Sequence, residues 1–150
     1  MKKQLKLTLL SCLLSIPAIT QAGPKDDIYR KGWIDFNKNG KMDIYEDPSA
    51  PIEERVKDLL SQMNMDEKTC QMATLYGSGR VLADALPTEK WKSEIWKDGI
   101  GNIDEEHNGL GKFGSEYAFP YAKHVKAIHD IQRWFVEETR LGIPVDFTNE

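Results

Sequence analysis

Residues 122–148 read AKHVKAIHDIQRWFVEETRLGIPVDFT, and this stretch decides the fold class. In its first part, 122–140, apolar side chains recur every three or four residues, for example at Val125, Ile128, Ile131 and Phe135. That spacing places them on one face of a helix. The sequence therefore predicts an amphipathic helix over 122–140.

The predicted helix ends at Arg140. Gly142 follows where a left-handed C-cap would lie, and Pro144 prevents the helix from resuming. Residues 143–148 then read as a short buried strand, and 98–103, before the helix, read as another. The intervening 104–121 predict a long surface loop, because glycines and prolines lie among charged and aromatic residues. Strand, loop, helix and strand make a parallel βαβ unit, so the expected fold class is α/β.

Two further helices are expected before this unit. The first, over 51–63, has apolar residues at helical spacing, among them Val56 and Leu60, with charged residues opposite. A second, short helix follows directly. Asn64 can cap its first turn, and Glu67, three residues on, can complete the reciprocal bonds of a capping box.

The first residues, 1–22, have the pattern of a secretory signal peptide. A lysine-rich start is followed by an apolar run that Pro17 interrupts and by a small-x-Ala ending at Ala22. The apolar run is too short to span a bilayer. A lipoprotein signal cut before Cys12 is the alternative. The sequence therefore predicts export to the periplasm, with secretion or an outer-membrane lipoprotein as alternatives.

Removing that segment makes the chain more acidic. It carries three lysines and no acid, so the formal net charge goes from −4 to about −7. An acidic exported protein is a poor candidate for binding nucleic acid or an anionic membrane. Cys70 would be the only cysteine left, which excludes an intramolecular disulfide and favours a packing role. No later stretch is apolar enough to predict a transmembrane span.

Residues 35–46, DFNKNGKMDIYE, match the spacing of an EF-hand calcium loop at every ligand position. Calcium takes six to eight oxygen ligands around one point, and short Asp and Asn side chains at alternate positions supply them as the chain curls. Gly40 permits the sharp turn. The predicted ligands are Asp35, Asn37, Asn39, the backbone carbonyl of Lys41, Asp43 and Glu46.

A solvated turn rich in Asp and Asn is the alternative reading of this loop. Pro48 interrupts the helix that would leave a paired EF-hand, and the sequence contains no second copy of the loop. Both features argue against a calcium sensor. A structural calcium ion that stabilises an N-terminal extension, 23–50, is therefore expected.

No Ser/His/Asp set and no phosphate-binding P-loop can be assembled from the residues present. His124 and His129 are five apart, which places them on different helix faces, so they are not a predicted zinc pair. Near the predicted strand ends the available carboxylates are Asp104, Asp146 and Glu150. Asp146 could equally be a buried, hydrogen-bonded structural acid.

Three segments together closely resemble the N-terminal part of glycoside hydrolase family 3, which contains exported β-glucosidases and β-xylosidases. They are PSAPIEERVKDLLSQMNMDEKTCQM (48–72), DGIGNI (98–103) and IQRWFVEETRLGIPVDFTNE (131–150). The resemblance implies that 51–150 begin a (β/α)8 TIM barrel of about 250 residues, of which this chain supplies roughly two strands. The expected product is an incomplete barrel, a fragment of a longer enzyme.

The resemblance also implies retaining hydrolysis, in which one carboxylate attacks the anomeric carbon and another protonates the leaving oxygen. In the family the nucleophile is an Asp on a later strand, and the acid is a Glu usually supplied by a second domain. Neither position falls within this chain, so no catalytic residue is assigned and the fragment alone is expected to be inactive. The expected parent is a periplasmic β-glucosidase that acts on oligosaccharides or other β-glycosides.

Glu150 aligns with the family carboxylate that grips sugar hydroxyls in the cleaved-bond subsite. Many members acting on glucosides have Asp there, and the longer Glu would suit a pentose, which motivates a xyloside hypothesis. One rival is a non-catalytic extracellular module that binds calcium or carbohydrate. A family 3 N-acetylglucosaminidase is less favoured, because those members usually carry their catalytic motif in a one-domain barrel of different sequence.

Overall fold

The structure is a computed structural model that describes residues 28–76, 84–93, 95–104, 117 and 119–148. The predicted signal peptide, 1–22, and the predicted sugar-binding Glu150 lie outside the described residues. Within them, no helix combines the length and apolar character needed to cross a membrane.

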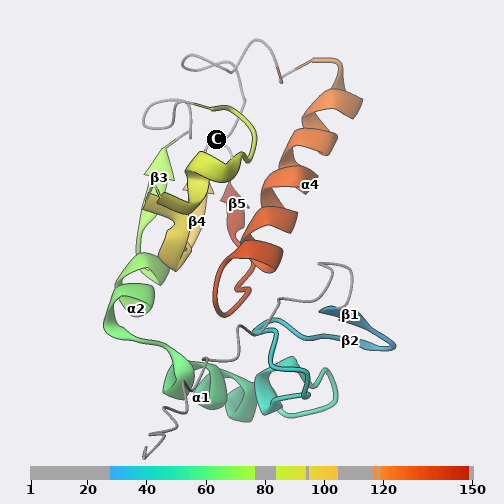
Figure 1. Ribbon diagram of the computed structural model, residues 1–150, viewed down its shortest axis with the longest axis vertical. Coiled ribbons are helices and arrows are strands. Elements are labelled where there is room, and N and C mark those ends of the chain that lie inside the picture. The colour runs from blue at the N-terminus through green and yellow to red at the C-terminus, as the bar shows by residue number, and fades with distance from the viewer. Residues whose placement is uncertain (1–27, 77–83, 94, 105–116, 118, 149–150) are drawn as a thin grey trace, which may run out of the picture.

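The described chain forms a small antiparallel hairpin, a three-stranded parallel sheet and three α-helices (Figure 1). The strands are β1 (Tyr29–Arg30), β2 (Trp33–Ile34), β3 (Thr74–Tyr76), β4 (Asn102–Asp104) and β5 (Asp146–Thr148). The α-helices are α1 (Ile52–Gln62), α2 (Met65–Gln71) and α4 (Tyr121–Glu138). Short 3-10 helices occur at η2 (Ile44–Glu46), η4 (Glu89–Ser93) and η5 (Ile95–Asp98).

The parallel sheet has the order β3-β4-β5, and its central row pairs Leu75 with Ile103 and Ile103 with Phe147. These three side chains belong to the main core, because Ile103 is fully buried and the other two pack against the buried cluster. Side chains alternate across a strand, so their neighbours point to the opposite face. On β4 and β5 those neighbours are polar: Asn102, Asp104, Asp146 and Thr148.

Helix α4 covers the apolar face of the sheet. Its buried residues Ile131, Trp134 and Phe135 join Trp91 and Val145 in one cluster. Rings in this cluster meet edge to face, with centroids 5.5 Å apart for Trp91 and Trp134. Burying one such side chain contributes about 1.5–3 kcal/mol, so this cluster stabilises the packing of α4 on the sheet.

The predicted βαβ unit is confirmed, because β4, α4 and β5 follow in order and β4 pairs with β5 in parallel. Both strands begin later than expected. A Cβ at Gly101 would lie 2.2 Å from the carbonyl oxygen of Gln71, so this segment crosses the end of α2 before the strand can start. Similarly, the Gln132 side chain bonds the N–H and C=O of Val145, both at 2.9 Å, which occupies the backbone just before β5.

The expectation of an incomplete (β/α)8 barrel is wrong. The described residues contain an open sheet of three strands, each three residues long, and a separate two-stranded hairpin. Closing a barrel requires strands that tilt and stagger around a common axis until the last pairs with the first. Three short strands with one helix across a single face do not do this. Both β3 and the hairpin were absent from the expected elements.

The helices before the sheet agree with the sequence. Helix α1 covers nearly the predicted 51–63. At the start of α2 the capping box is confirmed, since Asn64 Oδ1 accepts the Glu67 N–H and Glu67 Oε2 accepts the Asn64 N–H, both at 2.9 Å. Helix α1, however, buries none of its residues.

Candidate metal-binding loop

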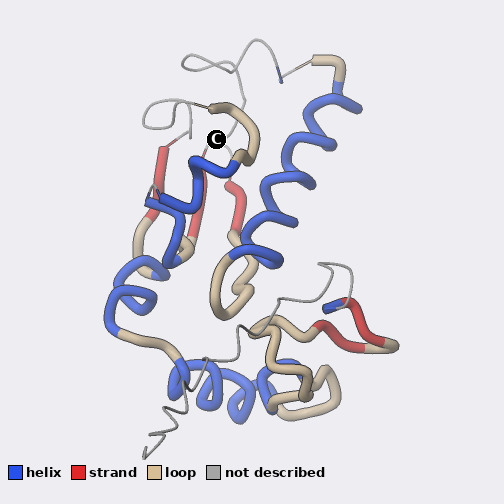
Figure 2. Tube along the Cα trace, in the orientation of Figure 1, coloured by secondary structure: helices blue, strands red, loops and turns tan. Residues whose placement is uncertain are grey.

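The loop 35–46 follows β2 and curls tightly before α1 (Figure 2). Its turn is built on two positive φ angles, 60° at Lys38 and 79° at Gly40. The carboxylate of Asp35 holds the curl, because Oδ1 accepts the Asn39 N–H at 3.0 Å and Oδ2 accepts the Gly40 N–H at 2.9 Å. Asp35 is 2% exposed, so this acid lies inside the loop.

The two asparagines repeat the same local pattern. Asn37 Oδ1 accepts the Asn39 N–H at 3.1 Å, and Asn39 Oδ1 accepts the Lys41 N–H at 2.7 Å. Such bonds to the backbone two residues on are the reason Asn and Asp favour turns. The residue types predicted as ligands therefore also determine the backbone of the loop.

The two acids at the end of the loop complete it. The side-chain amides of Asn37 and Asn39 both donate to Asp43 Oδ2, the second at 2.7 Å. Glu46, which is 3% exposed, accepts the Asn37 N–H at 3.2 Å and the Asp43 N–H at 2.9 Å. The start and the end of the loop are thus joined through these side chains.

The structure brings the five predicted side-chain ligands together in one hydrogen-bonded loop: Asp35, Asn37, Asn39, Asp43 and Glu46. Among the described residues, no group of three or more His, Cys, Asp or Glu side chains is placed so that it could hold a metal ion. In the loop itself the acids accept N–H groups instead. The amide nitrogens of Asn37 and Asn39 face Asp43 in this structure. A donor set of oxygens alone, which suits a hard cation such as Ca²⁺, requires both amides to rotate by half a turn and to give up their bonds from the Asn39 and Lys41 N–H groups.

The outer side of the loop contacts the end of α4. Lys38 Nζ donates to the carbonyl oxygens of Val136, at 2.8 Å, and Thr139, at 2.6 Å. Although much of the Lys38 residue is exposed, the loss of hydration at its buried ammonium lowers its pKa to about 8. The Tyr45 hydroxyl is 3.4 Å from the Leu141 carbonyl oxygen, and burial, aided by Glu46, raises the pKa of this phenol. No local pattern predicts these contacts, because they join residues about a hundred positions apart.

The other candidate residues are dispersed. His124 Nδ1 lies 3.2 Å from the Tyr117 carbonyl oxygen, and His129 is exposed on α4. Asp104 Oδ1 accepts the Thr148 hydroxyl at 2.8 Å. Asp146 is exposed, so it is not the buried acid that the sequence allowed.

An ion pair that the sequence did not predict fixes α2 against the end of α4. Arg140 Nε donates to Glu67 Oε1 at 2.8 Å, and its Nη2 donates to Glu67 Oε2 and to the Gln62 carbonyl oxygen. Glu67 is 4% exposed and also belongs to the capping box, so one carboxylate serves two elements. This pair holds structure and carries no free group for chemistry.

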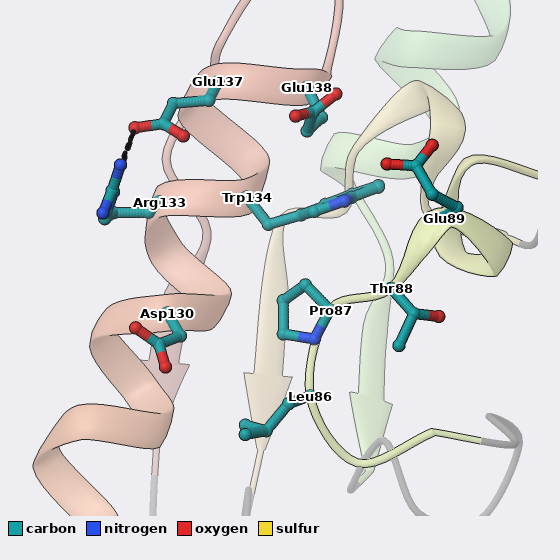
Figure 3. A pocket seen from close by; sticks show the side chains of 9 residues that line it. All are labelled: Leu86, Pro87, Thr88, Glu89, Asp130, Arg133, Trp134, Glu137 and Glu138. Carbon is teal, nitrogen blue, oxygen red and sulfur yellow. Dashed lines mark hydrogen bonds and ion pairs between the residues drawn. The ribbon is translucent and has the colours of Figure 1, made fainter. Parts of the chain in front are cut away.

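A hollow of about 350 Å³ lies between α4 and the residues 86–89 (Figure 3). Four of its lining residues are acidic: Glu89, Asp130, Glu137 and Glu138. Each has a cationic partner: Lys92 for Glu89 and Glu138, Lys126 for Asp130, and Arg133 for Glu137. These ion pairs account for all four acids of the hollow as parts of the fold.

No model of a known protein family matches the sequence. A protein from Formosa agariphila that is provisionally named a β-xylosidase is 32% identical over 109 residues. The aligned region covers 71% of this chain and 13% of that relative, so the chain spans only a small part of the relative's length. The likeness is to a glycoside hydrolase in the general sense. Membership of family 3 in particular stays a prediction from the sequence motifs.

Proposed function

We propose that this chain is part of an exported β-glycosidase that removes terminal β-linked xylose or glucose from oligosaccharides. The 109-residue similarity to the provisionally named β-xylosidase carries this proposal. The resemblance of the sequence motifs to glycoside hydrolase family 3 agrees with it. Because the alignment covers 13% of that relative, the activity is assigned to a longer polypeptide that includes this chain.

In this proposal the described residues supply scaffold. A retaining glycosidase needs two carboxylates about 5–5.5 Å apart, one as nucleophile and one as acid and then base. Several acids of the described elements are committed to contacts within the fold, among them Glu67, Glu137 and Asp104. We place the nucleophile and the acid in the remainder of the longer polypeptide, as the family resemblance implies, and this chain contributes Glu150 as a ligand for sugar hydroxyls.

The test compares the 150-residue chain with the full polypeptide encoded by its gene on aryl β-xyloside and aryl β-glucoside. We expect hydrolysis by the full polypeptide alone, and product of retained anomeric configuration by NMR. Substituting Glu150→Ala should lower kcat/KM by about 100-fold or more if it grips the sugar in the transition state. Sugar binding without hydrolysis by the full polypeptide would contradict the proposal and favour a non-catalytic module.

Glu150→Asp tests the sugar specificity. If the length of the Glu side chain excludes the hydroxymethyl group of glucose, the shorter Asp should raise the ratio of glucoside to xyloside kcat/KM by about tenfold. A clear preference of the unchanged enzyme for glucoside would contradict the pentose hypothesis and leave the glycosidase assignment intact.

We also propose that loop 35–46 binds a structural Ca²⁺ ion. Its backbone turns and its cluster of acid and amide side chains support this, with Asp35, Asn37, Asn39, Asp43 and Glu46 as side-chain ligands and Lys41 through its carbonyl. Isothermal titration with calcium chloride should give one site, and Glu46→Gln should remove it. A chain that binds no calcium, with an unchanged melting temperature in a chelator, would contradict this assignment.

A further inference from the structure

Successive residues of loop 35–46 make contacts on opposite sides of its backbone, one side facing the inside of the loop and the other facing the end of α4. Asp35, Asn37 and Asn39 bond within the loop. Phe36 and Lys38, which alternate with them, contact the end of α4 and the turn that follows. The same backbone curl therefore gathers the predicted ligands on the inside and directs other groups outward.

The main outward contact is made by Lys38. Helix α4 ends at Glu138, and the last carbonyls of a helix have no N–H partner within it. Lys38 Nζ donates to two oxygens at this end, those of Val136 and Thr139. An ammonium group there both satisfies the carbonyls and interacts favourably with the helix dipole. Lys38 is thus a cap for α4 that comes from a distant part of the chain.

A second contact fixes the turn between α4 and β5. Gly142 adopts φ 58°, and a Cβ built there would lie 2.6 Å from the Phe36 carbonyl oxygen. The loop backbone therefore lies directly against the turn. Together with the bond from Tyr45 to Leu141, this places the loop at the start of the segment that leads into β5.

We propose that a cation bound in loop 35–46 stabilises the carboxyl end of α4 and the turn into β5 through Lys38. This inference rests on the proposed calcium site. The cap requires the left-handed conformation of Lys38, whose two neighbours, Asn37 and Asn39, are both predicted ligands. A cation that holds both neighbours fixes this conformation, so the cap forms with less loss of entropy. By linkage, the cap must strengthen cation binding by the same factor.

Hydrogen exchange of the purified protein, with and without calcium chloride, tests this coupling. In the unchanged protein calcium should slow amide exchange in 35–46 and also, by about fivefold or more, in 136–142. In Lys38→Met the protection of 35–46 should remain, whereas the calcium effect on 136–142 should disappear. Lys31→Met is the matched control, because Lys31 is an exposed lysine of the same N-terminal segment, and it should behave as the unchanged protein.

Calorimetry gives a second measurement, the calcium binding constant of Lys38→Met. Its direction of change distinguishes the proposed coupling from charge repulsion between Lys38 and the cation. Removing a lysine beside a cation site should by itself tighten calcium binding, because like charges repel. The coupling predicts the opposite, a binding constant about fivefold weaker in Lys38→Met and partly restored in Lys38→Arg. Tighter binding in Lys38→Met would overturn the proposal.

The remaining outcomes distinguish this inference from the calcium site itself. If the protein binds no calcium, both fail. If calcium binds and protects 35–46 but not 136–142, the site stands and the coupling is overturned. Should Lys38→Met not fold, Glu46→Gln serves instead, since it removes the cation and keeps Lys38. Its exchange in 136–142 should then be insensitive to calcium, and persistent sensitivity would overturn the proposal.

Discussion

Helices α1 and α4 both carry an apolar stripe at helical spacing, and they differ in what faces the stripe. Helix α4 lies on the sheet and buries five residues: Ala127, Ile131, Trp134, Phe135 and Val136. Helix α1 buries none, and its Ile52, Val56 and Leu60 are 72%, 48% and 47% exposed. An amphipathic pattern therefore predicts a helix and the face available for packing, while burial of that face depends on a partner surface.

The surroundings of α1 show why its stripe stays exposed. An apolar hollow of about 310 Å³ separates part of this helix, at Ile52, Val56 and Leu59, from the turn that carries Leu141 and Pro144. A gap of this size leaves the lining side chains without neighbours to contact, so little dispersion energy is gained there.

The largest effect should come from the buried stripe. Phe135→Ala removes a fully buried ring from the cluster on the sheet and should lower the free energy of unfolding by about 3–5 kcal/mol. Urea unfolding followed by circular dichroism measures this. A loss below about 1 kcal/mol would show that α4 is not packed on the sheet as described.

Gly142→Ala tests how closely the loop lies against the end of α4. The added methyl would meet the Phe36 and Val136 carbonyl oxygens at 2.6 and 2.9 Å. It should lower the free energy of unfolding by about 2–3 kcal/mol, combining positive φ with the clash. Gly32→Ala is the matched control, since Gly32 also has positive φ but open space around it, and about 1 kcal/mol is expected there. Equal losses in the two variants would contradict the close contact.

Asn64→Ala should have a smaller effect, because it removes one half of the capping box of α2. The expected loss is about 1 kcal/mol in the free energy of unfolding. Thr69→Ala, an exposed change on the same helix, should lie within about 0.5 kcal/mol of the unchanged protein. If both variants unfold at the same urea concentration, the cap contributes nothing.

The smallest effect is expected on the exposed stripe. Val56→Ala deletes two methyl groups that already face solvent or the hollow, so unfolding should change by less than about 0.5 kcal/mol. Thermal unfolding of the two proteins side by side would detect a larger change. A loss of more than about 1 kcal/mol would mean that a partner surface covers α1 in solution.

Much of the local structure could be read from the residues. The capping box of Asn64 and Glu67, the end of α4 before Gly142, and the βαβ order all appear where the patterns place them. The correct prediction of a βαβ unit did not make the barrel prediction correct, although βαβ units are the building blocks of such barrels. A βαβ unit is common to many α/β folds, and the number and closure of strands depend on pairing that no local pattern encodes.

The candidate metal-binding loop also combines features that the sequence predicts with a contact that it does not predict. The residues predicted as ligands were named from spacing, and they lie in one curl, because Asp35, Asn37 and Asn39 each bond backbone groups within five residues. Metal binding by these residues stays a prediction. The contact of Lys38 with Val136 joins residues 98 positions apart, and no pattern in either segment predicts it.

The α-helices, the capping box of α2 and the curl of the loop could be predicted from the residues, because each depends on bonds between positions close together in the chain. Only the packed structure showed which apolar stripe is buried, where β4 and β5 begin, and which surface the loop touches. Those outcomes depend on contacts between segments far apart in the chain, such as Gln71 with Gly101 and Lys38 with the end of α4. They arise only when the packed chain brings these groups together.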